Sequence, residues 1–135
     1  MKTTDPTLFR LRIDAKVVGY MKLYSSGLKE FSNDQFWWHG QVIEYDQKDQ
    51  FSGQLDKNNR TLFEHDIILM RTASASAPKI NCLVEFNEKR QTFMLVELDT
   101  NTEYELFAND LAIFHKSELT FVGFSFPEAS DIYDS

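Results

Sequence analysis

The sequence predicts a mostly-β protein, and three observations lead to that prediction. Short stretches of alternating apolar and polar residues recur along the chain, as in half-buried strands. Turn-forming residues separate the later stretches at intervals of about eight to twelve residues, the spacing of an antiparallel meander. No apolar periodicity runs long enough for a long helix, and no repeat or linker divides the chain into independent domains.

The N-terminal third, residues 1–49, is expected to supply strands or a hairpin that pack against the rest. Phe9, Leu11 and Ile13 alternate with charged residues, which indicates a strand. A second extended piece follows at residues 17–23, and Ser-Ser-Gly at residues 25–27 is typical of a turn. The remaining N-terminal assignments are an ambiguous segment at 28–34, one or two aromatic strands at 36–45, and a break at 46–49.

Residues 50–126 are expected to form a small twisted β-barrel of SH3-like size. Asn58 and Asn59 predict a turn, because asparagine tolerates the left-handed conformation better than other residues with a side chain. Residues 72–78 read as a surface loop and residues 127–135 as an acidic, disordered tail. The other predicted elements are an apolar step at 62–64, strands at 67–70, 80–86, 92–98, 103–107 and 119–126, and a helical turn at 111–115 capped by Asn109 and Asp110.

Composition limits the partners and the compartment. The 135-residue chain has a net charge of −7, so its surface repels phosphate backbones and makes nucleic acid an improbable partner. The single cysteine, Cys82, excludes an intramolecular disulfide and is expected in the core. With no signal-like or membrane-spanning apolar run, the chain is expected in the cytoplasm of a bacterial host, without membrane, cofactor or small-molecule ligands.

Residues 50–68, QFSGQLDKNNRTLFEHDII, form the most informative stretch. They resemble the central signature of the YopX-like proteins of bacteriophages and prophages. The opening segment at 9–12 and the hairpin and closing strand at 83–96 and 119–124 resemble that family more weakly. The resemblance implies a phage or prophage accessory protein, without an established reaction and expected to be oligomeric.

The signature departs from the family pattern where a usual glycine is His65, which is expected to carry about 1 kcal/mol of strain if its φ is positive. Glycines, asparagines and acids at such positions more often specify a fold than a site. We therefore interpret the signature residues as structural: Gly53, Asp56, Asn58, Asn59, Glu64, Asp66 and Gly123.

The aromatic run beginning at Phe36 is the candidate interaction surface. In a strand, Trp37 and Trp38 would face opposite sides, so one of them should be exposed or lie in an interface. Tryptophan and tyrosine anchor many protein interfaces. Internal packing is the alternative for the surface residues Phe36, Trp37, Trp38, His39 and Tyr45.

No catalytic, cofactor-binding or metal-binding residue is predicted. The sequence holds no nucleophile elbow, phosphate loop or zinc-binding pattern. In Glu64-His65-Asp66 the histidine would point away from both acids, and His39 and His115 are remote in sequence. The basic residues are scattered, and Lys57, Arg60 and Arg71 form no stripe.

The leading functional hypothesis is therefore a non-enzymatic interaction module that binds a protein partner, itself, or both. The first alternative is an inhibitor of a host nuclease or defence system that presents a phosphate-like row of carboxylates. The second is a small β-barrel that binds nucleic acid. The carboxylates assigned to the phosphate-like row are Asp46, Asp49, Asp56, Glu64, Asp66, Glu97, Asp99, Glu103 and Glu105.

Overall fold

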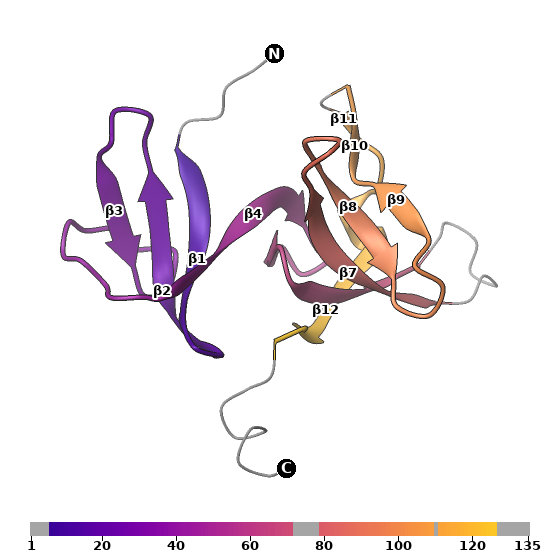
Figure 1. The fold of residues 1–135 in the computed structure, drawn as a ribbon, viewed down its shortest axis with the longest axis horizontal. Coiled ribbons are helices and arrows are strands. Elements are labelled where there is room, and N and C mark those ends of the chain that lie inside the picture. The colour runs from indigo at the N-terminus through magenta and orange to yellow at the C-terminus, as the bar shows by residue number, and fades with distance from the viewer. Residues whose placement is uncertain (1–5, 72–78, 110, 127–135) are drawn as a thin grey trace, which may run out of the picture. The chain divides into compact units, whose positions relative to one another are not determined.

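The computed structural model describes residues 6–71, 79–109 and 111–126, and nearly all regular structure among them is β-strand. The paired strands run antiparallel, which confirms the expected mostly-β class. The chain divides into two compact units (Figure 1). Of the described residues, the first unit holds 6–51 and 126, and the second holds those from 52 to 125. No described helix is long and apolar enough to cross a membrane.

The first unit is built on one antiparallel sheet. The strand predicted at residues 9–13 is confirmed, and Leu11 is fully buried with Met21 and Phe31. The burial does not follow the predicted alternation, because Arg10 and Arg12 are buried as well and Ile13 is 43% exposed. The segment left ambiguous at residues 28–34 contains a strand. In the order β3-β2-β1-β4, the strands are β1 (Thr7–Ile13), β2 (Lys16–Leu23), β3 (Lys29–Ser32) and β4 (Gln47–Leu55), the last of which continues into the second unit.

Charged residues lie on the side of β1 opposite Leu11, because consecutive strand residues point to opposite faces. Asp49 of β4 pairs in register with Arg10 and accepts hydrogen bonds from both Arg10 Nε and Arg12 Nε at 2.8 Å. Arg12 Nη2 completes a bidentate ion pair at 2.8 Å. The Phe126 ring covers both guanidiniums, with its centroid 4.0 Å from Arg12 Cζ. All three charged residues are buried.

This cluster explains why the expected break at residues 46–49 is wrong. Four charged or amide residues in succession, Asp46 to Asp49, look like a turn. In the structure β4 begins at Gln47, because the arginines of β1 provide Asp49 with partners inside the sheet. A buried carboxylate is tolerated in a strand when it is paired and hydrogen-bonded.

The second unit contains a five-stranded sheet in the order β12-β6-β7-β8-β9 (Figure 1). Its core includes Leu62, Ile68, Val84, Leu95 and Leu106, all fully buried. Its strands, besides the end of β4, are β5 (Thr61–Phe63), β6 (Asp66–Met70), β7 (Ile80–Asn87), β8 (Thr92–Glu97), β9 (Glu103–Glu105), β10 (Phe107–Ala108), β11 (Leu111–Ala112) and β12 (Leu119–Phe124).

The helical turn predicted at residues 111–115 is wrong. Residues 107–108 and 111–112 pair instead as a two-stranded hairpin, and Asn109 in its turn has a φ of 53°. Asparagine favours this left-handed conformation, which suits tight hairpins. The one described helical element is a 3₁₀ turn, Lys116–Glu118, capped by His115. Asp110, the loop expected at 72–78 and the tail expected at 127–135 lie outside the described residues.

His65 adopts the left-handed backbone conformation anticipated from the glycine of the resembling family, with a φ of 75°. Its N–H donates to the Val84 carbonyl at 2.8 Å, and its carbonyl accepts from Ser125 N–H at 2.8 Å, so the position is fixed on both sides. A side chain here stores strain that glycine would not.

We expect His65→Gly to be more stable than His65→Ala by about 1 kcal/mol, because both remove the imidazole but only glycine relieves the positive φ. Urea denaturation of the two variants measures the difference. The matched pair Val122→Gly and Val122→Ala, on the exposed side of strand β12, should show the opposite order. Equal stability of the two His65 variants would contradict the strain.

Candidate functional site: an aromatic turn

The residues expected to form an aromatic strand, 36–45, form a loop instead. Residues 33–46 connect β3 to β4, and their one β-bridge joins His39 to Phe31 through two backbone hydrogen bonds of 2.8 and 2.9 Å. The predicted strand is therefore wrong, although aromatic residues favour strands. The cause lies in the residues just before it.

Two side chains bend the backbone at the start of this loop. Ser32 is fully buried, and its Oγ accepts the N–H groups of Asp34 and Gln35 at 3.2 and 2.9 Å. Asp34 Oδ1 then accepts those of Phe36 and Trp37 at 2.8 and 3.0 Å. Serine and aspartate side chains stabilise turns by bonding backbone groups two or three residues ahead. Four successive N–H groups are thereby taken from any strand ladder.

The same bonds affect the titration of Asp34. The N–H groups of Trp37 and then Phe36 lower the pKa of its carboxyl below the ordinary value, because they stabilise the charged form. The capped turn is therefore favoured above the ordinary aspartate pKa, and this contribution is lost as the pH falls through the lowered pKa.

The capped turn displays two aromatic side chains to solvent. Phe36 is 89% exposed and Trp37 is 74% exposed. Trp38, by contrast, is half-buried: its Nε1 donates to the Gln35 carbonyl at 3.2 Å, and Lys22 Nζ lies 4.3 Å from its ring centroid. We call residues 32–39 the aromatic turn.

The other two predicted surface residues are less accessible. His39 is half-buried, and its Nδ1 is buried without a hydrogen-bond partner among the described residues. Tyr45 packs with Ile43 against the first unit's core. Of the five predicted residues, the structure brings Phe36 and Trp37 together at the surface and directs Trp38, His39 and Tyr45 partly inward.

The signature residues of the second unit lie in turns and at strand ends. Asp56 is 1% exposed and accepts three backbone N–H groups, from Asn58, Arg60 and Phe121. Asn59 has a φ of 62°. Gly53 also has a positive φ, and a Cβ there would lie 3.2 Å from the Phe107 ring.

The remaining signature residues bracket strands β6 and β12. Buried Asp66 accepts the Phe63 N–H at 2.8 Å, and Glu64 lies in the turn between β5 and β6. Gly123 lies where the β12–β6 register shifts. These contacts stabilise the backbone conformation at turns and strand ends, as the structural interpretation of the signature expects.

Burial removes three residues from the phosphate-like row of carboxylates. Asp49, Asp56 and Asp66 are at most 1% exposed and bond to arginines or backbone N–H groups. The row as predicted is therefore wrong. Short polar residues flanked by turns looked exposed in the sequence, but their carboxylates are used inside the fold.

Cys82 is fully buried in the second core, as expected. Burial and then the Glu97 charge raise the pKa of its thiol to about 11. Because the thiolate is the reactive form, this sulfur is a poor nucleophile at neutral pH. Across residues 6–71, 79–109 and 111–126, no three His, Cys, Asp or Glu side chains gather closely enough to hold a metal ion.

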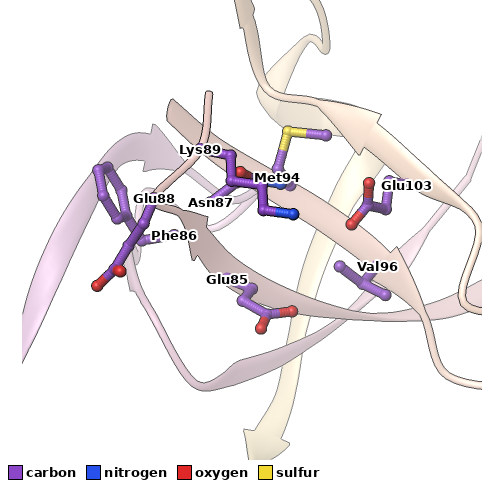
Figure 2. A pocket seen from close by; sticks show the side chains of 8 residues that line it. All are labelled: Glu85, Phe86, Asn87, Glu88, Lys89, Met94, Val96 and Glu103. Atoms are coloured by element: carbon purple, nitrogen blue, oxygen red, sulfur yellow. The ribbon is translucent and has the colours of Figure 1, made fainter. Parts of the chain in front are cut away.

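One open cavity of about 410 Å³ lies on the β7–β8 hairpin (Figure 2). Its floor includes the buried side chain of Met94, and Glu85, Glu88 and Glu103 carry carboxylates around it. Lys89 lies among them, as Figure 2 shows. Sequence reasoning did not single out this cavity, because its wall combines β7, β8 and β9.

Comparisons with family models, with curated proteins and with solved structures find no match to this chain.

Proposed function

We propose that this protein is a non-enzymatic interaction module of phage or prophage origin, acting in the bacterial cytoplasm, that binds a protein partner through the aromatic turn. The proposal depends on one observation: Phe36 and Trp37 are largely exposed on a backbone that four hydrogen bonds hold in place. Exposed tryptophan and phenylalanine on a pre-organised turn can bury a large area at little cost in conformational entropy. The resemblance of residues 50–68 to YopX-like proteins supports the origin.

We further propose that the second unit is a small barrel of SH3-like type that serves as the scaffold. Five antiparallel strands in one sheet, with one core of buried aliphatic residues, support this assignment. Among the described residues of the scaffold, no exposed aromatic side chain is comparable to those of the turn: the exposed large apolar residues are Leu98, Leu111, Ile113 and Val122.

The test is capture of a partner from bacterial lysate on the immobilised full chain. We expect a specific protein to be retained by the wild type and lost with Phe36→Ala/Trp37→Ala, with affinity at least about a hundredfold lower, because central aromatic contacts each contribute about 2 kcal/mol or more. Trp37 emission should shift to the blue when the purified partner is added, as its indole leaves water.

The matched control is Leu28→Ala/Val122→Ala, which truncates two side chains 60% and 56% exposed outside the turn. Its capture should equal that of the wild type. If both double variants lost capture equally, the binding would be nonspecific adsorption to exposed apolar side chains. Retention of the partner by Phe36→Ala/Trp37→Ala would refute the aromatic turn as the binding site. A salt-sensitive gel shift with nucleic acid would favour the alternative ligand.

A further inference from the structure

Cations that are scattered in the sequence gather at one edge of the second unit's sheet, beside β12. Lys116 Nζ donates to Asn59 Oδ1 at 2.5 Å, which brings its charge to the turn that precedes Arg60. Lys57 N–H donates to the Leu119 carbonyl at 2.9 Å, and Arg71 N–H to the Glu118 carbonyl at 2.8 Å. The backbone positions of these residues are therefore close to the start of β12, although the residues form no stripe in the sequence. We call Lys57, Arg60, Arg71 and Lys116 the basic edge.

The basic edge forms no ion pair among the described residues. No carboxylate of the described chain forms an ion pair with any of its four members, although acids outnumber bases by 21 to 14 in the sequence. Two carboxylates that lie beside it, Asp56 and Glu118, keep their charge and accept hydrogen bonds from backbone N–H groups. Asp56 accepts three N–H groups, and Glu118 Oε1 accepts that of His115 at 2.8 Å.

Arg60 is also oriented to bind. Its Cζ lies 3.6 Å from the centroid of the Phe121 ring, so one face of the guanidinium is covered. Its backbone N–H donates to Asp56 Oδ1, but its guanidinium N–H groups donate to no acceptor in the described chain. A stacked guanidinium leaves its planar edge available for carboxylates.

Exposed carboxylates lie on the other half of the same sheet, from its central strand β7 to its end strand β9. β12 and β9 are the two end strands of the order β12-β6-β7-β8-β9. Exposed Glu85, Glu88, Asp99 and Glu103 lie on β7, β9 and the turns joined to β8, with Lys89 among them. Arg90 in the same turn pairs with Glu105 of β9 at 3.2 Å. We call these four carboxylates the acidic edge. Three of them line the cavity of Figure 2, whose apolar floor, formed by Met94 and Val96, suits the aliphatic stem of a lysine or arginine.

We infer that the chain self-associates by docking the basic edge of one copy on the acidic edge of a second copy. Both edges belong to one compact unit, so the contact needs no other part of the chain. Complementary charges fix register and partner more than they add affinity, and the apolar cavity floor adds burial. The aromatic turn takes no part, so this inference stands or fails separately from the proposed function.

The test is sedimentation velocity of the full chain at about 0.1 M and about 1 M salt, where the screening length falls from about 10 to about 3 Å. At the lower salt the assembly should exceed the monomer mass of 15.8 kDa, and its dissociation constant should rise by about tenfold or more at the higher salt. The double variant Lys57→Glu/Lys116→Glu should be monomeric at both salt concentrations. Lys16→Glu/Lys29→Glu, which changes net charge equally in the first unit, should assemble like the wild type.

A charge exchange makes the test specific. Glu85→Lys/Glu103→Lys should also be monomeric alone, whereas an equimolar mixture with Lys57→Glu/Lys116→Glu should assemble again, because each variant then offers the other complementary edges. A monomeric wild type, or a mixture that stays monomeric while both variants are folded by circular dichroism, would overturn the inference. Phe36→Ala/Trp37→Ala should assemble normally.

Discussion

Replacing Asp49 by asparagine is expected to lower the free energy of unfolding of the first unit by about 3–5 kcal/mol. The substitution keeps the shape of the side chain but removes its charge. Arg10 and Arg12, 2% and 6% exposed, would keep their charges while losing the carboxylate that both contact. Removing the carboxylate that buried charges contact is among the most destabilising results of a single substitution.

Tryptophan fluorescence during urea denaturation measures this effect selectively, because both tryptophans, Trp37 and Trp38, belong to the first unit. Glu44→Gln is the matched control: it also neutralises an acid, but an exposed one with no hydrogen bond to a described residue. Its free energy of unfolding should stay within about 0.5 kcal/mol of that of the wild type. Equal midpoints for Asp49→Asn and Glu44→Gln would show that the buried ion pairs contribute nothing.

A triple replacement separates the contribution of the cluster from the cost of breaking it. Arg10→Met/Arg12→Leu/Asp49→Met removes all three buried charges together. Because desolvation offsets much of the attraction within a buried ion cluster, this variant should be far more stable than Asp49→Asn and near the wild type. A triple variant as unstable as the single one would instead mean that the ion pairs themselves hold β1 to β4.

Local alternation was enough to predict most strands. Residues 80–86 and 119–124 carry a period-two pattern that burial of Val84 and Leu119 explains. Residues 9–13 form the predicted strand, but Arg10 and Arg12 are buried in it as well as Leu11. The left-handed backbone at Asn59 and His65 also followed from the sequence, since few residue types are tolerated there. In each case the deciding interaction is local or depends only on the hydrophobic pattern.

The predictions that failed concern two kinds of side-chain interaction. Some side chains pair with residues far away in the sequence, and others accept backbone N–H groups that a strand would use to bond its neighbour. The propensity of Phe36 and Trp37 for strands was outweighed by Ser32 and Asp34, which take up the backbone N–H groups ahead of them. Asp49 looked like a turn residue because its partners are 37 and 39 residues away. The pattern Ser-x-Asp before an aromatic run was the available signal for the turn.

The basic edge could not be found in the sequence for a related reason. Lys116 and Asn59 are 57 residues apart and meet only because β12 closes against the turn at Asp56. The pairing order of strands, not any local motif, therefore decides which charges become neighbours. The same dependence makes Asp56 the residue through which the turn and the closing strand are joined.

Replacing Asp56 by alanine is accordingly expected to destabilise the second unit by about 3 kcal/mol, because three backbone N–H groups would lose a charged acceptor. Asn58 and Arg60 donate within the turn at 2.9 and 3.0 Å, and Phe121 donates from a strand 65 residues away at 2.9 Å. Asp56→Asn keeps one carbonyl oxygen and should lose about half as much. Amide hydrogen exchange measures the effect directly: Arg60 and Phe121 should be protected in the wild type and exchange together in Asp56→Ala.

Asn58→Ala is the control for the turn, since its exposed side chain bonds to no described residue while its N–H remains available to Asp56. It should leave the exchange of Phe121 unchanged. If Arg60 alone lost protection in Asp56→Ala, the carboxylate would stabilise only its own turn, and β12 would be held by its ladder with β6. Loss of protection at both amides would instead show that one buried carboxylate couples the turn carrying Lys57 and Arg60 to the strand that follows Lys116, and thereby keeps the basic edge assembled.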